Sequence, residues 1–389
     1  MSIKLIKSSF YNEEKTKDNL CKFIQQAKQL SFGEYCKKFE KSFANRQNRK
    51  YCIFLNSWSS ANLGLLQALI NLWRLKKWDN VGFSSLTWST DVMPIIEVGL
   101  NPIPIDVEIS TLNVSLDTVK ETLKEKKISA LLITNLLWFC DNIGEISEFC
   151  KQNNIILLED NCESMWTVHK WKKLWNFWLA STFSTYVGHH ISTIEWGMIC
   201  TDDRDLYIML HMVRAHWRDR NLDIDLQEEI RNKYNLDQFY SKYTFYTLWY
   251  NFRPSEINWF LWCEQMNYLD EIVIKRETNF KKFISIVNKN NDFYEINYDH
   301  IDTVSNFALP IICKSKELFD IYTKKFNDAG VEIRPIVGWD MTQQIFREDI
   351  YGKNHKDTNA KYIHKNWFYF GNSPEYTQEE IETLSSLLK

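Results

Sequence analysis

The sequence lacks several patterns that would point to whole classes of protein. Its 389 residues contain no apolar run long enough to span a membrane, and the N-terminus MSIKLIKSSFYNEEK has no apolar stretch typical of a secretion signal. The nine cysteines include no C-x-x-C pair, so nothing supports a zinc or thioredoxin-type site. A formal net charge of −3 does not favour nucleic-acid binding. We therefore expect a soluble cytoplasmic protein with reduced thiols, no metal site, and no nucleic-acid or membrane partner.

Glycine is also scarce, and tryptophan is abundant. The chain has 11 glycines and 16 tryptophans, whereas glycine usage is typically near ~7%. Many tryptophans stand where turns favour glycine, as in KKWDN, LLWFCDN and IEWG. A bulky residue at positive φ costs roughly 1–2 kcal/mol, out of a net stability of about 5–15 kcal/mol. The pattern indicates that glycines have been replaced throughout the chain, with a loss of stability.

Segments typical of strands and helices alternate along most of the chain. This order predicts an α/β fold with a large, mostly parallel sheet and helices on both faces. We expect one N-terminal helix over 11–48, a polar irregular loop over 221–243 and one long helix over 255–287. The predicted organisation is an N-terminal helical segment (1–48), a large cofactor-binding domain (49–255), and a linking helix with a small C-terminal α+β domain (256–389).

Two stretches carry the polar residues with the clearest chemical meaning. The apolar strand at 155–161 ends in Asp160, and Glu163 follows it. The stretch STFSTYVGHHISTIEWG at 181–197 contains Ser184, His189 and Glu195. Ligands of open α/β sheets bind at the carboxyl ends of the strands, where Asp160 is expected. Taken alone, the His-His pair is more often a surface or core feature than a site.

Together these stretches resemble the sugar aminotransferases of the DegT/DnrJ/EryC/StrS type, in pyridoxal-phosphate fold-type I. The family motif S-x-x-x-x-K carries the lysine that binds the cofactor covalently. Here Ser184 matches the serine, and His189 stands in the place of the lysine. An imidazole moves protons near neutral pH but has no primary amine for a Schiff base. The resemblance therefore implies the sugar 3-dehydratase branch of the family, with His189 as the catalytic residue.

The same resemblance assigns further roles along nearly the whole chain. The predicted contacts to pyridoxal or pyridoxamine phosphate begin with a phosphate-binding turn at a helix start and an aromatic residue that stacks on the ring. The two carboxylates after the strand at 155–161 and the serine of the family motif are also predicted to contact the cofactor. An asparagine is predicted to reach the cofactor of the neighbouring subunit. These residues are Ser57, Trp58, Ser59, Trp88, Asp160, Glu163, Ser184 and Asn251. Trp58 departs from the family pattern, and its indole is expected to obstruct the phosphate. The predicted substrate or amino-donor contacts are His216, Arg218, Arg253 and Arg334.

The resemblance also implies the reaction and its partners. Pyridoxamine phosphate condenses with an NDP-4-keto-6-deoxyhexose, the C3 hydroxyl leaves after His189 moves a proton, and L-glutamate regenerates the cofactor amine. The expected nucleotide is GDP and the expected product a precursor of a dideoxysugar such as colitose in lipopolysaccharide. A homodimer with shared active sites is expected.

Three alternatives remain open at this point. An iron–sulfur dehydratase would need four cysteine ligands, but after Cys200 only Cys263 and Cys313 follow. A sugar aminotransferase would need the lysine, and none lies between Lys173 and Lys233. The third alternative is a non-catalytic, destabilised variant of the same scaffold, in which the tryptophans prevent folding or cofactor binding.

Overall fold

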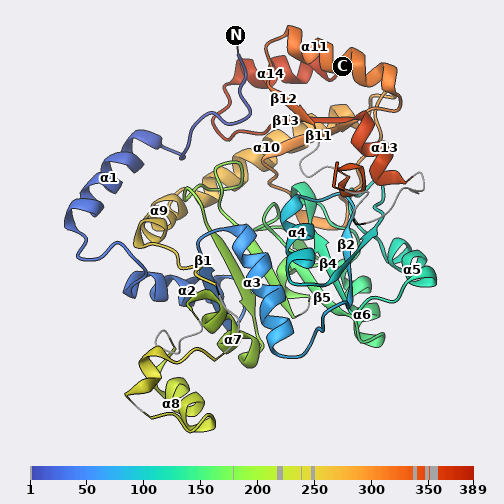
Figure 1. The fold of residues 1–389 in the computed structure, drawn as a ribbon. Coiled ribbons are helices and arrows are strands. Elements are labelled where there is room, and N and C mark those ends of the chain that lie inside the picture. Colours follow the sequence, from blue (N-terminus) through green and yellow to red (C-terminus); the bar gives the residue numbers. More distant parts are fainter. Residues whose placement is uncertain are drawn as a thin grey trace.

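A computed structural model describes residues 2–177, 179–216, 222–237, 239–246, 250–335, 340–346, 350 and 358–389. A large central sheet lies between layers of helices, and a smaller sheet near the C-terminus is covered by further helices (Figure 1). No helix within the described ranges combines the length and the apolar character needed to cross a membrane.

The central sheet has seven strands in the order β1-β9-β8-β5-β4-β2-β3. All of them run parallel except β9, which pairs antiparallel with both β1 and β8. The crossovers between parallel strands are helical, as expected for a βαβ architecture. This arrangement confirms the predicted α/β fold. The strands are β1 (Tyr51–Leu55), β2 (Asn80–Ser84), β3 (Asn101–Ile105), β4 (Ala130–Thr134), β5 (Ile156–Asp160), β8 (Ala180–Ser184) and β9 (Gly197–Thr201).

Helices cover both faces of this sheet because successive strand residues point to opposite sides. In β1, Ile53 and Leu55 belong to one apolar core, and Cys52 and Phe54 belong to the other. The first core is closed by α3 (Trp58–Asn71), α4 (Ser89–Glu97) and α7 (Arg204–Arg214). The second is closed by α2 (Glu34–Arg46), α5 (Leu116–Glu125), α6 (Ile143–Gln152) and parts of the C-terminal region.

The prediction of a single helix over 11–48 is wrong. Two helices occupy this region, α1 (Glu13–Gln26) and α2, and the chain between them includes a bridge from Ser31 to Ser255. The Glu256 carboxylate accepts hydrogen bonds from the backbone N–H groups of Gly33 (2.7 Å) and Cys36 (3.2 Å). A carboxylate at a helix N-terminus satisfies free N–H groups and complements the helix dipole. A residue more than 200 positions away therefore defines the start of α2.

Two other helix predictions also differ from the structure. The region 255–287 contains two helices, α9 (Glu256–Met266) and α10 (Leu269–Val287), separated at Asn267 and Tyr268. The polar region 221–243, predicted as an irregular loop, contains α8 (Ile224–Lys233), which buries Ile230. The polar composition concealed this helix because so little of its surface is buried.

The C-terminal region carries a three-stranded antiparallel sheet in the order β11-β13-β12. Its strands are β11 (Ala308–Ile312), β12 (Ile333–Pro335) and β13 (Trp367–Gly371), and the accompanying helices are α11 (Lys316–Asp328), α13 (Asn359–Asn366) and α14 (Gln378–Leu387). A second small sheet, which we did not predict, joins β10 (Ile301–Thr303) to the hairpin of β6 (Val168–His169) and β7 (Lys172–Lys173).

A buried ion pair ties α2 to α7 at the β1 edge of the central sheet. The Arg214 guanidinium donates to the Glu40 carboxylate and to the Phe54 carbonyl oxygen at 2.9 Å, and it lies 3.0 Å from His211 Nδ1. Glu40 also accepts from the Phe54 N–H at 2.9 Å. Burial raises the pKa of Glu40, and the neighbouring Arg214 opposes this shift.

Candidate functional site

Asp160 lies at the carboxyl end of β5, as the sequence predicted. It pairs with Thr134 of β4 and Thr182 of β8, and it is almost completely buried. Its Oδ1 accepts a hydrogen bond from the Cys162 N–H at 2.9 Å. Its Oδ2 accepts from Asn62 Nδ2 at 3.1 Å and from the Trp58 indole Nε1 at 2.6 Å. The carboxylate is thus held in place by several donors.

Behind Asp160 lies a buried polar cluster that sequence reasoning missed. Asn62 Nδ2 also donates to Asp91 Oδ1 at 2.6 Å, and Thr134 Oγ1 donates to Asp91 Oδ2 at 2.6 Å. Burial first, and then the charge of Asp160, raise the pKa of Asp91 well above its usual range. Asn62 lies four residues, about one helical turn, after Trp58. This spacing places both side chains on the same face of α3 and could have predicted that both approach Asp160.

The predicted phosphate-binding turn is the beginning of α3. Ser57 is the N-cap, and its Oγ accepts from the Ser60 N–H at 3.1 Å. Ser59 is exposed, and a surface hollow lined by Ser59, Ser60, Ser89 and Thr90 lies where α3 and α4 begin. The helix start therefore provides free backbone N–H groups for an anion.

Trp58 is the first residue of α3, and its side chain turns toward the sheet. The indole donates to Asp160, and its ring centroid lies 6.1 Å from that of His189. The tryptophan is therefore bonded to the carboxylate and lies next to the histidine.

His189 follows β8 in a turn in which its N–H donates to the Tyr186 carbonyl oxygen at 2.9 Å. Burial lowers the pKa of His189 to about 4, although the nearby Asp160 charge acts in the opposite direction. Its Nδ1 has no hydrogen-bond partner among the described residues. A neutral imidazole with a free nitrogen can accept a proton at neutral pH.

His190, the second member of the pair, has a structural environment. Its Nε2 lies 2.9 Å from Ser305 Oγ, and its ring is 4.1 Å from that of Trp138. Arg276 donates to the His189 carbonyl oxygen at 3.4 Å and lies 3.3 Å from His190 Nδ1. Both His190 nitrogens thus have neighbours, which leaves His189 as the histidine available for chemistry. Sequence reasoning did not single out Arg276.

Glu163 lies beside this region, in the turn after β5. Its Oε2 accepts from the Leu137 N–H at 2.9 Å. Burial raises the pKa of Glu163 to about 8, so the side chain is protonated at neutral pH. A neutral carboxylic acid can donate a hydrogen bond as well as accept one.

Glu163→Gln is expected to remove part of the pH dependence of stability. The folded protein keeps this carboxyl protonated up to about pH 8, whereas the unfolded chain ionises it near 4.5. Its stabilising contribution is therefore present below pH 4.5 and is lost as the pH rises through 8. Glutamine shows no such loss, so between these limits the variant should gain on the order of 4 kcal/mol relative to the parent chain. Urea unfolding at several pH values measures this gain, and parallel pH profiles for the two proteins would contradict the prediction.

Two further predicted cofactor contacts are Ser184, which is buried, and Trp88, which is exposed. Ser184 ends β8 next to Gly197 of β9, and its Oγ accepts from the Tyr186 N–H at 3.2 Å. Trp88 is the N-cap residue of α4, and its side chain is 46% exposed. The indole of Trp88 is therefore accessible for stacking.

Three predicted residues, His216, Asn251 and Arg253, lie on two neighbouring chain segments that bond to each other. Ala215 and Asn251 form a β-bridge, and the His216 N–H donates to the Tyr250 carbonyl oxygen at 3.0 Å. Arg253 Nε donates to Asn251 Oδ1 at 3.0 Å. Asn251 is exposed, and Arg253 is partly exposed.

The other two predicted substrate contacts are Arg334 and Arg218. Arg334 lies on β12 and donates two hydrogen bonds to Glu332 Oε1, at 3.2 and 2.9 Å. Arg218 lies outside the described residues.

A pocket opens beside the histidine turn. Among its lining residues are His189, His190, Arg276, Phe307 and Glu375. Neither Asp160 nor Trp58 lines this pocket. His189 is therefore reached from this pocket, whereas Asp160, which is almost completely buried, is not.

Some residues of the site are suited to binding pyridoxal phosphate, the cofactor that the resemblance implies, and one residue obstructs it. Asp160 can face a pyridinium nitrogen, and the start of α3 can hold a phosphate. However, Asp160 Oδ2 is already bonded to Trp58 Nε1, and the indole fills the approach. The site with Trp58 in this position does not accommodate the cofactor.

One group of residues has the composition of a metal site. The possible ligand atoms of Cys140, His169 and His300 all lie within 4.8 Å of one another. His169 Nδ1 lies 3.0 Å from the His300 carbonyl oxygen, and His300 Nε2 lies 2.7 Å from the Cys140 carbonyl oxygen. One nitrogen of each histidine is therefore engaged with backbone, and the group links the β6–β10 sheet to the loop after β4.

Comparison with known sequences gives a match over most of the chain. The model of the DegT/DnrJ/EryC1/StrS aminotransferase family matches residues 11–389. GDP-4-keto-6-deoxy-D-mannose 3-dehydratase of Escherichia coli O55:H7 is 32% identical over 372 residues, covering 94% of this chain and 95% of that protein. The protein of the same name from Yersinia pseudotuberculosis is 31% identical over 391 residues, covering 98% and 97%.

Solved structures of similar proteins share the whole fold. A crystal structure of GDP-4-keto-6-deoxymannose-3-dehydratase with a trapped PLP-glutamate geminal diamine superposes with a TM-score of 0.89, at 30% identity and over 100% of both chains. A variant of that enzyme with bound GDP-perosamine gives the same values. The predicted pyridoxal-phosphate fold is thereby confirmed.

Proposed function

Since the chain belongs to the DegT/DnrJ/EryC1/StrS aminotransferase family, we propose that its activity is the removal of the C3 hydroxyl from a GDP-linked 4-keto-6-deoxyhexose. The relatives named as 3-dehydratases match at 32% and 31% identity over nearly their full length. The observation that carries the proposal is the buried, neutral His189 in the place of the family's lysine.

The absence of a lysine near this position distinguishes the proposal from an aminotransferase. The flanking lysines in the sequence are Lys173 and Lys233. Lys173 lies on β7, and its Nζ donates to the Arg46 carbonyl oxygen at 2.5 Å. A histidine cannot form a Schiff base with a carbonyl group, so its role is proton transfer.

The roles of the other residues follow from their surroundings. In a chain with glycine at position 58, Asp160 and the start of α3 would hold the pyridine nitrogen and the phosphate of pyridoxamine phosphate, and the cofactor would supply an electron sink for breaking bonds next to the sugar's C4 carbon. His189 would accept a proton at its unpartnered Nδ1 and return it. The protonated Glu163 would offer a neutral hydrogen bond.

The proposal also covers the second subunit, the amino donor and the cellular setting of the reaction. Asn251 and Arg253 bond to each other on the surface, which suits a contribution to the active site of a second subunit in a homodimer. L-Glutamate is the proposed amino donor, and an arginine suits its carboxylate because the guanidinium binds carboxylates through two parallel hydrogen bonds. The proposed setting is cytoplasmic synthesis of a dideoxysugar for lipopolysaccharide.

The test is to incubate the protein with pyridoxal phosphate, L-glutamate and GDP-4-keto-6-deoxymannose, in the chain as it stands and in a Trp58→Gly chain. A 3-deoxy product with release of ammonia supports the proposal. A 4-amino sugar product, or a cofactor that borohydride fixes to a lysine, would indicate an aminotransferase instead. A folded protein that binds cofactor but does not turn over the substrate contradicts the proposed activity.

A further inference from the structure

We infer that positions 58, 73, 78, 138 and 171 of this fold are glycine positions, that the working protein carries glycine there, and that Trp58 closes the cofactor site. Trp73, Trp78, Trp138 and Trp171 all have positive φ, of 59°, 74°, 73° and 64°. Only two glycines, Gly99 and Gly330, do so in the described residues. Left-handed backbone favours glycine and strains residues with a side chain. The part of the inference that concerns Trp58 rests on the proposed function.

Trp73 follows the end of α3 in a motif that recurs in the protein. Its N–H donates to the Ile70 carbonyl oxygen, and the Arg74 N–H donates to that of Leu69, both at 2.9 Å. These are the two bonds of the Schellman motif, whose left-handed residue is usually glycine or asparagine. The same bonds end α2, α4, α6, α8 and α11, where the left-handed residues are Asn48, Gly99, Asn154, Asn235 and Gly330. Trp73 is the exception, and its side chain is 81% exposed, so no packing offsets the strain.

Trp78 and Trp171 stand in two different kinds of turn that both call for glycine. In the turn closed by the Asp79 N–H to the Lys76 carbonyl oxygen (3.0 Å), Trp78 is the third residue and has positive φ. Glycine is the usual residue at that place. Lys170 and Trp171 form the two-residue loop of the β6–β7 hairpin, and both have positive φ. Such loops favour glycine at the second position.

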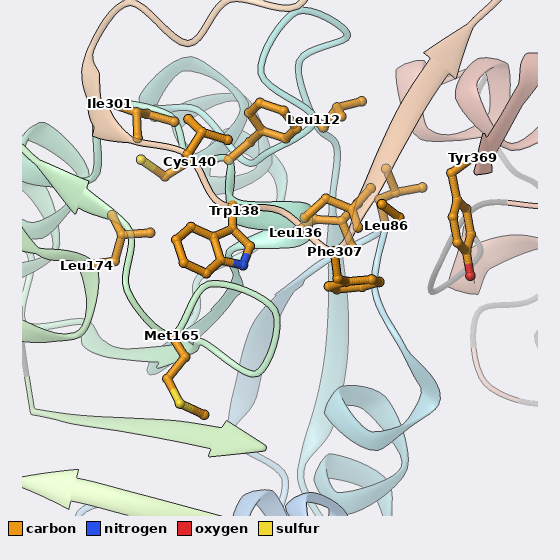
Figure 2. Packing of buried hydrophobic residues seen from close by; sticks show 14 of the residues in the cluster. Leu86, Leu112, Leu136, Trp138, Cys140, Met165, Leu174, Ile301, Phe307 and Tyr369 are labelled. Carbon is orange, nitrogen blue, oxygen red and sulfur yellow. The ribbon is translucent and has the colours of Figure 1, made fainter. Parts of the chain in front are cut away.

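Buried tryptophans give a second, independent observation. The indole nitrogens of Trp138, Trp196 and Trp367 are buried without a hydrogen-bond partner among the described residues. Figure 2 shows the Trp138 indole among apolar side chains such as Leu136 and Leu174, with its nitrogen on the side of Leu136. Buried indole N–H groups normally find an acceptor, because leaving one unpaired loses the hydrogen bond it made with water. At these three positions the surroundings therefore provide no acceptor for the indole N–H group.

At position 58, tryptophan in place of glycine is inferred to affect cofactor binding rather than stability. Trp58 Nε1 donates a hydrogen bond to Asp160 Oδ2, and its ring lies beside that of His189. Nearby, a Cβ built on Gly197 would lie 2.2 Å from the Ser57 carbonyl oxygen, so the backbone at this helix start is closely packed against β9. A glycine at position 58 leaves Asp160 open and keeps the N-cap bond of Ser57.

A single cause accounts for positions in turns, in the core and in the site. Suppose that the cells that make this protein decode one codon as glycine, and that the same codon is read elsewhere as tryptophan. Tryptophan would then replace glycine wherever that codon occurs, in turns, in the core and in the site. The proportion of 16 tryptophans to 11 glycines fits this cause. Trp259 is a useful contrast, because it lies within α9, has no positive φ and stacks on Tyr35 at 4.3 Å.

The first experiment compares tryptophan-to-glycine variants of the full chain. Trp58→Gly is expected to bind pyridoxal phosphate at least tenfold more tightly than the parent chain, as measured by absorbance titration. Trp73→Gly is expected to raise the thermal midpoint by about 2–4 °C, and the control Trp259→Gly to lower it. No gain in cofactor binding overturns the assignment of Trp58. A midpoint for Trp73→Gly at or below that of the parent chain overturns the assignment of position 73. If Trp58→Gly binds cofactor but does not dehydrate the sugar, this inference stands and the proposed function fails.

The second experiment is tandem mass spectrometry of the protein isolated from its own cells. Peptides that span positions 58, 73, 78 and 171 are expected to carry the glycine residue mass. The peptide that contains Trp88, to which the family resemblance gives the role of stacking on the cofactor ring, is expected to keep tryptophan. Tryptophan at all of these positions would overturn the inference.

Discussion

Replacing His189 by asparagine, in a chain that carries glycine at position 58, is expected to lower the dehydration rate by about 10²–10⁴-fold. Asparagine keeps a polar side chain of similar reach but cannot take up a proton. Single-turnover kinetics with GDP-4-keto-6-deoxymannose measure the effect. Pyridoxal phosphate binding should stay within a few-fold, because Asp160 and the start of α3 are unchanged.

The matched control is His190→Asn in the same background. His190 is held by Ser305 and lies against Trp138 in the core, so its loss should reduce stability more than the rate of the chemical step. Equal losses of rate in the two variants would contradict a special role for His189. A lysine at position 189 offers a further check, since it should form an imine that borohydride reduces.

Glu40→Ala is expected to destabilise the protein by roughly 3–5 kcal/mol, which is typical of breaking one side of a buried ion pair. Arg214 is fully buried and would keep the Phe54 carbonyl, His211 and the ring of Phe32 as neighbours, but would lose its carboxylate partner. Urea unfolding monitored by circular dichroism measures the change in the free energy of unfolding.

A double variant tests whether the unpaired charge is the cause. Glu40→Ala combined with Arg214→Met replaces the charge by an apolar side chain of similar length, and it should recover a large part of the loss. If the double variant is less stable than Glu40→Ala alone, the guanidinium contributes through contacts other than the ion pair.

Much of the candidate site was accessible from the sequence because its signals are local. Asp160 was expected at the end of an apolar strand, and the structure places it there, beside Thr182 of β8. The match of Ser184 and His189 to a family motif needed only their spacing. By contrast, the sequence could not show what surrounds His190, because its partners Ser305 and Arg276 are far away along the chain.

Errors in the helix predictions have a related physical cause. A helical pattern continues across 27–33, yet the chain breaks there because Glu256 binds the N–H groups at the start of α2. The α8 helix was missed because it buries almost nothing. Hydrophobic periodicity cannot predict a helix boundary that depends on a residue far away in the sequence. It also cannot predict a helix that has no apolar stripe.

The sequence by itself determined the alternation of strands and helices, the edge of the sheet that carries the site, and the excess of tryptophan over glycine, since each is a property of neighbouring residues. Only the tertiary structure decided what that excess does. Backbone angles show Trp73, Trp78, Trp138 and Trp171 in left-handed conformations. Position 58 meets Asp160 only because β1 and β5 bring their carboxyl ends to one edge of the sheet, where the first residue of α3 faces the carboxylate.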